Sequence, residues 1–310
     1  MRLIAGFLKM IRLPNLVFIA LTQILFQFCI FLPLYGESIP ENDTVQFIFI
    51  AIASLLIAAG GYIINDYFDI NIDEINKPKQ MVVDKVIHRR WAIAWHFILS
   101  SSGIIFTFLS VPLFEKWYII LANIFCVALL WFYSTSFKKS LLIGNVVIAL
   151  LTSWTILILF FTKLSPGDAM GSDSPANYKL FRIAFLYAGF AFVISLIREA
   201  IKDMEDLPGD EKHGCRTMPV VWGVNATKVY VAVWLVVLVA LLVILQVYVL
   251  QFNWWWPVIY SSLLIIGPLI FIFYRLYSAA GTASFHSLSN WTKFVMLTGI
   301  LSMIFFHFYL

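Results

Sequence analysis

Long runs of apolar residues alternate with short polar stretches along the whole chain. Nine of these runs approach 20 residues, the length that a helix needs to cross about 30 Å of hydrocarbon. Backbone groups inside lipid must find partners within the protein, so we expect every run to be a helix rather than an open strand. The expected spans are 14–34, 45–65, 91–112, 117–135, 141–162, 181–201, 229–250, 255–275 and 291–309. The pattern predicts one all-α integral membrane domain over residues 1–310, with nine transmembrane helices around a central apolar cavity.

Composition supports lipid as the main solvent. The chain is 62% hydrophobic and only 12% charged, whereas soluble domains average about a quarter charged residues. The first apolar run follows the basic segment from Arg2 to Arg12. It is long enough to span a bilayer and shows no small-residue cleavage site, so we interpret it as a helix rather than a signal peptide. The cysteines Cys29, Cys126 and Cys215 lack paired spacing, which argues against a disulfide framework or a zinc site.

Lys and Arg residues are distributed unevenly between the two sides of the predicted bundle. If the N-terminus is cytoplasmic, 17 of the 21 basic residues fall in cytoplasmic segments and four fall in external ones. This bias is the positive-inside pattern of membrane proteins. It predicts a cytoplasmic N-terminus, an external C-terminus and a turn-rich external connection over 163–180. The two long polar connections, about 66–90 and 202–228, then lie on the cytoplasmic side.

Both cytoplasmic connections begin with the same arrangement of acidic residues. Each follows an apolar helix and carries carboxylates at the first, fourth and eighth positions of one template, with a constant offset between the two copies. The matching residues are Asp66, Asp69 and Asp73 in the first copy and Asp203, Asp206 and Asp210 in the second. Because the offset also equals four predicted helices, we interpret the motifs as parts of an internal repeat.

The spacing of these acids has a chemical consequence. Carboxylates at positions i, i+3 and i+7 share one face of a helix, and two such faces brought together repel each other unless cations neutralise them. Mg²⁺ prefers oxygen ligands and is commonly held by one or two carboxylates together with substrate phosphates. Two acidic faces at the end of a bundle with an apolar interior therefore fit an amphiphile with a diphosphate head and an isoprenoid tail.

Chance is the competing explanation, because charges in cytoplasmic loops are commonly just solvated. Against it, ten of the 17 acidic residues lie within Asp66–Glu74 or Glu199–Glu211. We therefore predict a magnesium site that both motifs share. Its predicted catalytic ligands are Asp66, Asp69, Asp203 and Asp206, and its further ligands are Asp73 and Asp210, which would bind the metal or orient neighbouring basic residues.

Polar residues beside the motifs are candidates for binding the diphosphate. Basic side chains there would stabilise the charge that develops on a departing diphosphate, although positive-inside anchoring explains them too. Polar residues inside apolar runs commonly line a bundle interior. The candidates are Asn65, Arg198, Lys202, Lys138, Tyr133, Asn145 and Asn15, of which Asn15 also fits a helix cap.

These motifs resemble the UbiA-type prenyltransferase superfamily. The resemblance rests on Asn65-Asp66-x-x-Asp69-x-x-x-Asp73 and on Arg198-Glu199-x-x-Lys202-Asp203-x-Glu205-Asp206-x-x-Gly209-Asp210, followed by Arg216-Thr217-x-Pro219. Arg12-Leu13-Pro14-Asn15, Tyr133-Ser134 with Lys138, and Gly144-Asn145 fit the same pattern, so the resemblance covers nearly the whole chain. It implies Mg²⁺-dependent transfer of a prenyl group from its diphosphate. It also places Asn65, Asp66, Asp69, Asp203, Asp206 and Asp210 in the metal and diphosphate site.

Two segments bear on the acceptor. After the first motif, many aromatic-acceptor members of the superfamily carry an Arg-rich stretch ending in Pro-Leu-x-x-Gly, from which this chain departs at Asn76–Asp84. The second motif resembles the branch that acts on geranylgeranylglyceryl phosphate in ether lipid synthesis. The basic residues Lys77, Lys79, Arg89 and Arg90 fit a phosphate-bearing acceptor, so we favour that lipid phosphate. An aromatic acceptor of quinone synthesis, 4-hydroxybenzoate or naphthoate, is the alternative.

A membrane transporter is the alternative from another class, because repeats and intramembrane polar residues occur in transporters as well. However, the acids lie at the cytoplasmic end rather than at mid-membrane, and the helices lack matching central Gly or Pro breaks. The predicted partners are an isoprenyl diphosphate, a lipophilic acceptor and membrane lipid, with no nucleic acid. The sequence leaves the prenyl chain length, the oligomeric state and the catalytic base open.

Overall fold

The computed structural model describes residues 2–36, 39–78, 81–165, 167 and 174–310. Within this described part, nine helical segments are long and apolar enough to cross a membrane. They are Leu13–Tyr35, Asp43–Phe68, Arg89–Ser110, Trp117–Thr135, Ile143–Lys163, Pro175–Lys212, Val224–Leu250, Trp255–Ser278 and Gly281–Tyr309. Each overlaps one predicted span, so the predicted number and order of helices are confirmed. Residues 166 and 168–173 of the expected external connection lie outside the described residues.

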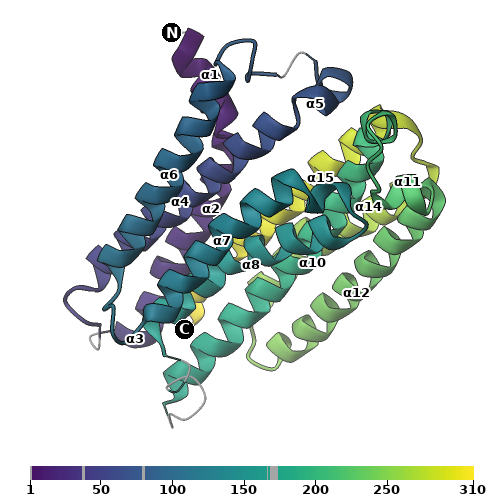
Figure 1. The fold of residues 1–310 in the computed structure, drawn as a ribbon. Coiled ribbons are helices and arrows are strands. Elements are labelled where there is room, and N and C mark those ends of the chain that lie inside the picture. The colour runs from purple at the N-terminus through teal and green to yellow at the C-terminus, as the bar shows by residue number, and fades with distance from the viewer. Residues whose placement is uncertain (1, 37–38, 79–80, 166, 168–173) are drawn as a thin grey trace.

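Some membrane-spanning segments are built from several helical pieces, and short helices flank others (Figure 1). Two of the segments contain a π-helical stretch, η1 in the first and η4 in the eighth. In chain order the pieces are α1 (Arg2–Met10), α2 (Leu13–Leu25), η1 (Phe26–Phe31), α3 (Leu32–Tyr35), α4 (Asp43–Phe68), α5 (Ile70–Asn76), α6 (Arg89–Ser110), α7 (Trp117–Thr135), η3 (Phe137–Lys139), α8 (Ile143–Lys163), α10 (Pro175–Lys212), α11 (Met218–Val221), α12 (Val224–Leu250), α13 (Trp255–Ser261), η4 (Ser262–Ile266), α14 (Gly267–Ser278), α15 (Gly281–Leu301), η5 (Ser302–Phe305) and α16 (Phe306–Tyr309).

Six of the helices form a closed ring around the cavity. α2 packs against α4, α4 against α7, α7 against α8, α8 against α10, α10 against α15, and α15 returns to α2. α6 packs outside α4 and α7, while α12 and α14 cover the outer side of α10 and α15. The short helices α1, α5 and α11 lie at one end of this bundle and α3 lies at the other (Figure 1). The end of the ring that carries α1, α5 and α11 is where a polar site can form.

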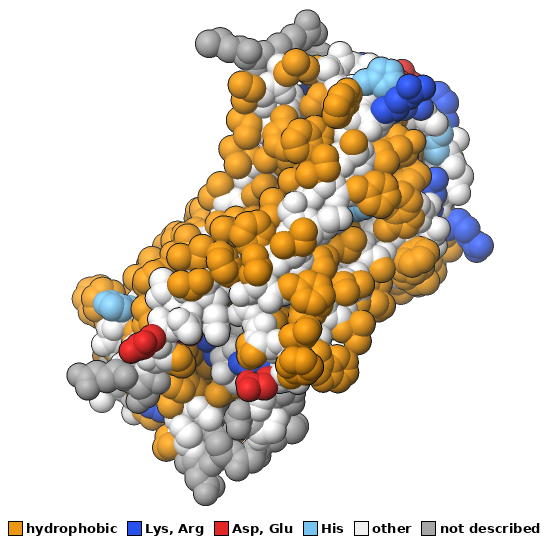
Figure 2. Space-filling model, turned by 60° about the vertical axis from the view of Figure 1, so that its left-hand side comes forward, with side chains coloured by type: hydrophobic (Ala, Val, Ile, Leu, Met, Phe, Trp, Pro, Cys, Tyr) orange, Lys and Arg blue, Asp and Glu red, His pale blue; other side chains and the backbone are white. Residues whose placement is uncertain are grey.

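Apolar side chains cover the outside of the bundle, as a lipid environment requires. On α12, which packs on the ring from one side only, Val229, Ile244 and Val247 are exposed. Figure 2 shows hydrophobic side chains over the middle of the molecule and charged side chains gathered near its ends. The exposed apolar band matches the membrane protein that the composition predicts.

A buried ion pair holds the end of the ring that lies away from α5. Asp43 at the start of α4 and Lys163 at the end of α8 form this pair, with side chains only 4% and 3% exposed. Gln27 of η1 donates a hydrogen bond of 2.7 Å to Asp43, and the Lys163 ammonium lies 4.4 Å from the centre of the Phe31 ring. The pair therefore joins the first spanning segment, α4 and α8.

Removing one partner of this pair leaves the other buried and unpaired. We expect Lys163→Met to destabilise the protein by about 3–5 kcal/mol, measured by unfolding in detergent. Adding Asp43→Asn to that variant restores much of the loss, because no uncompensated charge then remains. Lys179→Met, at an exposed position, serves as the control. Equal losses in the single and double variants would contradict a role for the pair.

Candidate active site

The first acidic motif lies where α4 passes into α5. Asp66 is on the last turn of α4, Asp69 occupies the junction and Asp73 lies on α5. Backbone hydrogen bonds from Asp69 N to Asn65 O (3.0 Å) and from Asp73 N to Asp69 O (2.8 Å) carry helical spacing across the junction. The three carboxylates therefore share one face, as their spacing predicts.

The second acidic motif lies on a continuous helix. α10 runs through Pro208 to Lys212, so Asp203, Asp206 and Asp210 share a face as well. The connection expected over 202–228 is thus mostly helical, in α10, α11 and the start of α12. α10 continues beyond the apolar run because α5 packs against its extension, a tertiary contact that the local sequence does not show.

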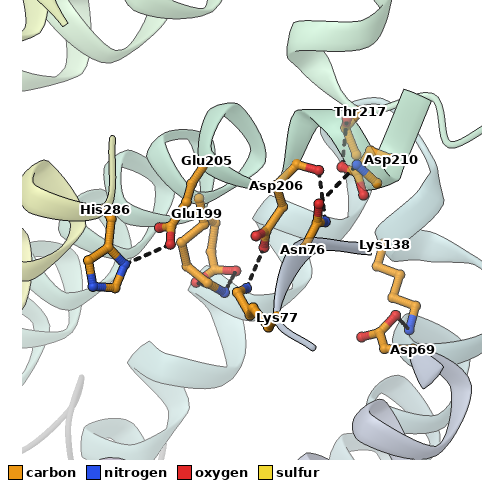
Figure 3. A network of polar contacts seen from close by, with 12 residues as sticks. Asp69, Asn76, Lys77, Lys138, Glu199, Glu205, Asp206, Asp210, Thr217 and His286 are labelled. Carbon is orange, nitrogen blue, oxygen red and sulfur yellow. Dashed lines mark hydrogen bonds and ion pairs between the residues drawn. The ribbon is translucent and has the colours of Figure 1, made fainter. Parts of the chain in front are cut away.

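Close contacts between α5 and α10 join the two motifs (Figure 3). Asn76 donates through Nδ2 to the Asp206 carbonyl oxygen at 2.9 Å and accepts a 2.9 Å hydrogen bond from Gly209 N. Lys77 Nζ pairs with Asp206 Oδ2 at 2.7 Å. A Cβ on Gly209 would lie 2.5 Å from Asn76 Nδ2, so a side chain there would force the Asn76 amide to move. Glycine at position 209 therefore lets Asn76 make both hydrogen bonds to α10.

Basic side chains from two turns hold the carboxylates of the first motif. Arg12 lies between α1 and α2 with a left-handed backbone (φ 51°), and its Nη2 donates to Asp66 Oδ1 at 2.7 Å. Lys138 of the η3 turn forms an ion pair with Asp69. This turn packs closely on the start of α8 because Gly144 lacks a side chain: a Cβ there would lie 2.9 Å from the Lys138 Cα.

Neutral donors hold two carboxylates of the second motif. Asn145 Nδ2 donates to Asp203 Oδ2 at 2.9 Å, and Thr217 Oγ1 donates to Asp210 Oδ2 at 3.1 Å. Asn145 does not line the cavity described below. The structure therefore places it behind Asp203, where it orients that carboxylate, and its predicted contact with the diphosphate stays a prediction.

The acids surround the mouth of a large cavity enclosed by the ring. Its volume is about 1130 Å³. The deeper walls include apolar side chains such as Phe18, Ile57, Leu151, Phe190 and Met303. A charged mouth with an apolar interior is the arrangement that an amphiphilic ligand requires.

The donor atoms at the mouth fit Mg²⁺ bound to a diphosphate. In the described residues, no three acids, histidines or cysteines come close enough to hold a metal ion by themselves. Mg²⁺ does not need such a cage, because substrate phosphates and water commonly complete its octahedron. The Asn65 Oδ1 atom is buried and has no hydrogen-bond partner, so an amide oxygen is available beside Asp66. These side chains offer oxygen donors only, which Mg²⁺ prefers.

Every predicted site residue except Asn145 lines the cavity. The structure adds Arg12, Asn76 and Lys77 to the lining of the cavity. The sequence indicates Arg12 only as part of a terminal motif, Asn76 only as part of the segment after the first motif, and Lys77 as a charge that fits a phosphate-bearing acceptor. The structure also adds a polar row on α15, whose residues are Thr282, His286, Asn290 and Lys293. Their helical spacing on one face is a signal in the sequence that our prediction missed. Lys79 lies outside the described residues.

Comparison with known proteins agrees with this geometry. The model of the UbiA prenyltransferase family matches residues 24–306. The digeranylgeranylglyceryl phosphate synthase of Methanosphaera stadtmanae is 30% identical over 251 residues, which cover 80% of this chain and 83% of the relative. The chain belongs to the UbiA prenyltransferase family. The predicted superfamily and the prenyltransferase class are thereby confirmed.

Solved structures of other UbiA proteins share the fold of this prenyltransferase. One, from work on the biosynthesis of digeranylgeranylglyceryl phosphate synthase in membranes, matches with a TM-score of 0.60 at 23% identity over 98% of this chain and 99% of that chain. A UbiA homologue from Archaeoglobus fulgidus bound to DMAPP and Mg²⁺ matches with a TM-score of 0.56 at 16% identity, over 96% and 99% of the two chains. The predicted nine-helix architecture around a cavity is confirmed.

The contact between Gly209 and Asn76 can be tested with a matched pair of variants. We expect Gly209→Ala to reduce prenyl transfer at least tenfold, because the added methyl group displaces the Asn76 amide and breaks the hydrogen bonds that hold α5 on α10. Gly189→Ala lies on the same helix, and its Cβ meets nothing within 4 Å, so it keeps full activity. Equal activities of the two variants, measured with the same membrane preparation, would show that the close approach is not needed.

We predict that metal binding by the first motif depends on pH through Asp73. Burial, with Asp69 as a further cause, raises the pKa of Asp73 to about 6 from its ordinary 3.8. Ionising this group therefore costs the metal-free protein stability as the pH rises through this range. Mg²⁺ needs the carboxylate ionised, so the gain in melting temperature on adding Mg²⁺ increases between pH 5 and pH 7. Asp73→Asn flattens this increase. A gain independent of pH in the unmodified protein would contradict the prediction.

Proposed function

We propose that this prenyltransferase transfers a prenyl group from a Mg²⁺-bound isoprenyl diphosphate to geranylgeranylglyceryl phosphate. The observation that carries the proposal is the meeting of two acidic motifs, through α5 and α10, at the mouth of one apolar cavity. The donor binds with its head at Asn65, Asp66, Asp69, Asp203 and Asp206 and its tail in the cavity. Mg²⁺ supplies neutralisation of the diphosphate charge there.

The transfer breaks one C–O bond and forms another. The allylic C–O bond of the donor ionises, and its electron pair leaves with the diphosphate. The basic residues Lys138 and Lys77, held beside the motifs by Asp69 and Asp206, offset the charge that grows on the leaving group. The cavity excludes water from the carbocation, and Tyr133 contributes an aromatic face to its wall. The acceptor hydroxyl oxygen then bonds to the prenyl carbon and loses its proton to a base.

Three observations support a lipid phosphate as the acceptor. The matching synthase of Methanosphaera stadtmanae is named for the digeranylgeranylglyceryl phosphate that it makes, and the second motif of this chain resembles the same branch. The segment after the first motif departs from the Arg-rich pattern of many aromatic-acceptor enzymes. An aromatic acceptor is the second candidate, and it requires the same metal and diphosphate chemistry.

The charge distribution supports a cytoplasmic active site. The acidic motifs lie at the same end of the bundle as α1 and α11, and this is the end at which the basic residues of the chain concentrate. By the positive-inside pattern this end faces the cytoplasm. The N-terminus is then cytoplasmic and the C-terminus external, because the described part of the chain has nine segments long and apolar enough to cross the membrane.

Product formation by the purified protein tests the proposal. The assay supplies Mg²⁺ and labelled geranylgeranyl diphosphate with geranylgeranylglyceryl phosphate or 4-hydroxybenzoate, each with and without EDTA. We expect an EDTA-sensitive ether lipid. An EDTA-sensitive prenylated benzoate would overturn the acceptor and keep the metal mechanism. Transfer that survives EDTA would overturn the metal mechanism.

Single variants test the two motifs separately. We expect Asp66→Asn and Asp203→Asn each to lower the rate at least about a hundredfold, a loss typical of removing one group that stabilises a developing charge. Asp84→Asn is the control, because Asp84 lies on the same connection but pairs with Arg89 outside the cavity. Melting temperatures in detergent establish that all three variants are folded. Full activity in either motif variant would refute the shared site.

A further inference from the structure

A row of polar side chains on α15 faces the cavity and belongs to neither acidic motif. Its residues, Thr282, His286, Asn290 and Lys293, all line the cavity. Lys293 is the deepest of the four and lies within the membrane-spanning segment Gly281–Tyr309. A lysine in such a segment is costly unless it has a partner or a ligand, so its position indicates a function.

The packing of α15 on α10 fixes the depth of Lys293. The two helices belong to the sixth and ninth spanning segments and therefore run in opposite directions. Glu205 Oε1 lies 2.7 Å from His286 Nδ1 at the mouth of the cavity. Arg198 lies seven residues inward from Glu205, and Lys293 lies seven residues inward from His286. Seven residues span about 10 Å of helix, so Arg198 and Lys293 lie at the same depth.

Positive charge is in excess at this depth. Arg198 Nη1 and Lys202 Nζ share the carboxylate of Glu199, at 2.9 Å and 3.1 Å, and the Arg198 Nε atom is buried without a hydrogen-bond partner. Lys293 makes no ion pair with any described residue, yet it interacts electrostatically with Arg198 and Lys202. Arg198, Lys202 and Lys293 form what we call the cationic pocket. Its one ion-paired carboxylate is Glu199, and Glu205, which contacts His286, also interacts electrostatically with Lys293. Clustered cations that lack enough anionic partners repel one another, so the pocket favours an anion.

The cationic pocket differs from the place where the acids are held. Asp69 and Asp206 already have basic partners of their own, Lys138 and Lys77. In Figure 3, the contact of His286 lies at one end of the polar network and the Lys138–Asp69 pair lies at the other. The donor diphosphate is bound on the side of the acids, which leaves the pocket for a second anionic group.

We propose that the cationic pocket binds the phosphate monoester of the acceptor and that Lys293 is its specificity-determining residue. This inference rests on the proposed function and reassigns Arg198 and Lys202 from the donor diphosphate to the acceptor phosphate. In a glycerol phosphate the free hydroxyl and the phosphate ester are on carbons at most two apart. The hydroxyl oxygen must come within about 3.5 Å of the reacting carbon, so two anions meet in one cavity. Cations beside the second anion remove that repulsion.

Kinetics of a charge-removing variant test the role of Lys293. The assay uses geranylgeranyl diphosphate, Mg²⁺ and geranylgeranylglyceryl phosphate with the full-length protein. We expect Lys293→Gln to raise KM for the acceptor about 10- to 100-fold, which is the loss of one charge-assisted contact, while KM for the donor changes less than twofold. Lys293→Arg recovers most of the affinity. Lys212→Gln, exposed and outside the cavity, changes neither value. An equal rise of both KM values, or no change in either, would overturn the proposal.

Ligand binding without donor or metal tests the pocket independently of catalysis. The melting temperature is measured in EDTA with geranylgeranylglyceryl phosphate, with the uncharged geranylgeranylglycerol and with inorganic phosphate. The lipid phosphate stabilises the unmodified protein more than the alcohol does, and Lys293→Gln abolishes this difference. Equal stabilisation by the lipid phosphate and the alcohol would overturn the proposal that the pocket binds a phosphate. If inorganic phosphate stabilises the protein as much as the lipid phosphate does, the pocket does not select a lipid headgroup. If no acceptor is prenylated, the proposed function fails while this measurement still decides the pocket.

Discussion

The close approach of α5 to α10 is the contact on which the rest of the site depends. Gly209 admits Asn76 at hydrogen-bond distance, and this contact brings together two acidic faces that are far apart in the sequence. The helix ring alone would give an apolar cavity with no defined head group site. With the contact in place, the cavity has a mouth lined by oxygen donors from both halves of the chain, which is what a metal diphosphate requires.

Ion pairs explain how so many acidic side chains can lie together at the mouth of the cavity. Among the described residues, no three acids, histidines or cysteines are close enough to bind a metal ion by themselves. Lys138 and Lys77 pair with one carboxylate of each motif, so the acids are oriented before any cation arrives. At the opposite end of the ring, Asp43 is likewise paired with a basic residue, Lys163, and both side chains are buried. The cationic pocket is the exception, because only two of its three cations, Arg198 and Lys202, have an ion pair among the described residues, both with Glu199. We assign the pocket to a ligand for that reason.

The sequence predicts those features that depend on local pattern. Apolar run lengths predict all nine spanning segments, and the repeated spacing of the acids predicts which faces carry the site. Tertiary contacts are not predictable in this way. Asn145 is recognisable as a polar residue in an apolar run, but only packing places it behind Asp203. The extension of α10 to Lys212 depends on α5, and the role of Arg12 depends on a left-handed backbone. The polar row on α15 can be predicted from its helical spacing. How deep each of its residues lies in the cavity depends on how α15 is aligned along α10, which the sequence does not show.

The most direct test of a shared metal site is a structure of the protein with Mn²⁺ and a non-reactive isoprenyl diphosphate analogue, with the metal located by its anomalous scattering. A site held by both motifs predicts metal density at the cavity mouth between Asp66 and Asp69 on one side and Asp203 and Asp206 on the other. Oxygen ligands from both motifs then surround the metal, and the isoprenoid tail lies in the apolar interior. Metal bound by one motif alone, or a diphosphate bound away from the acids, would contradict the shared site.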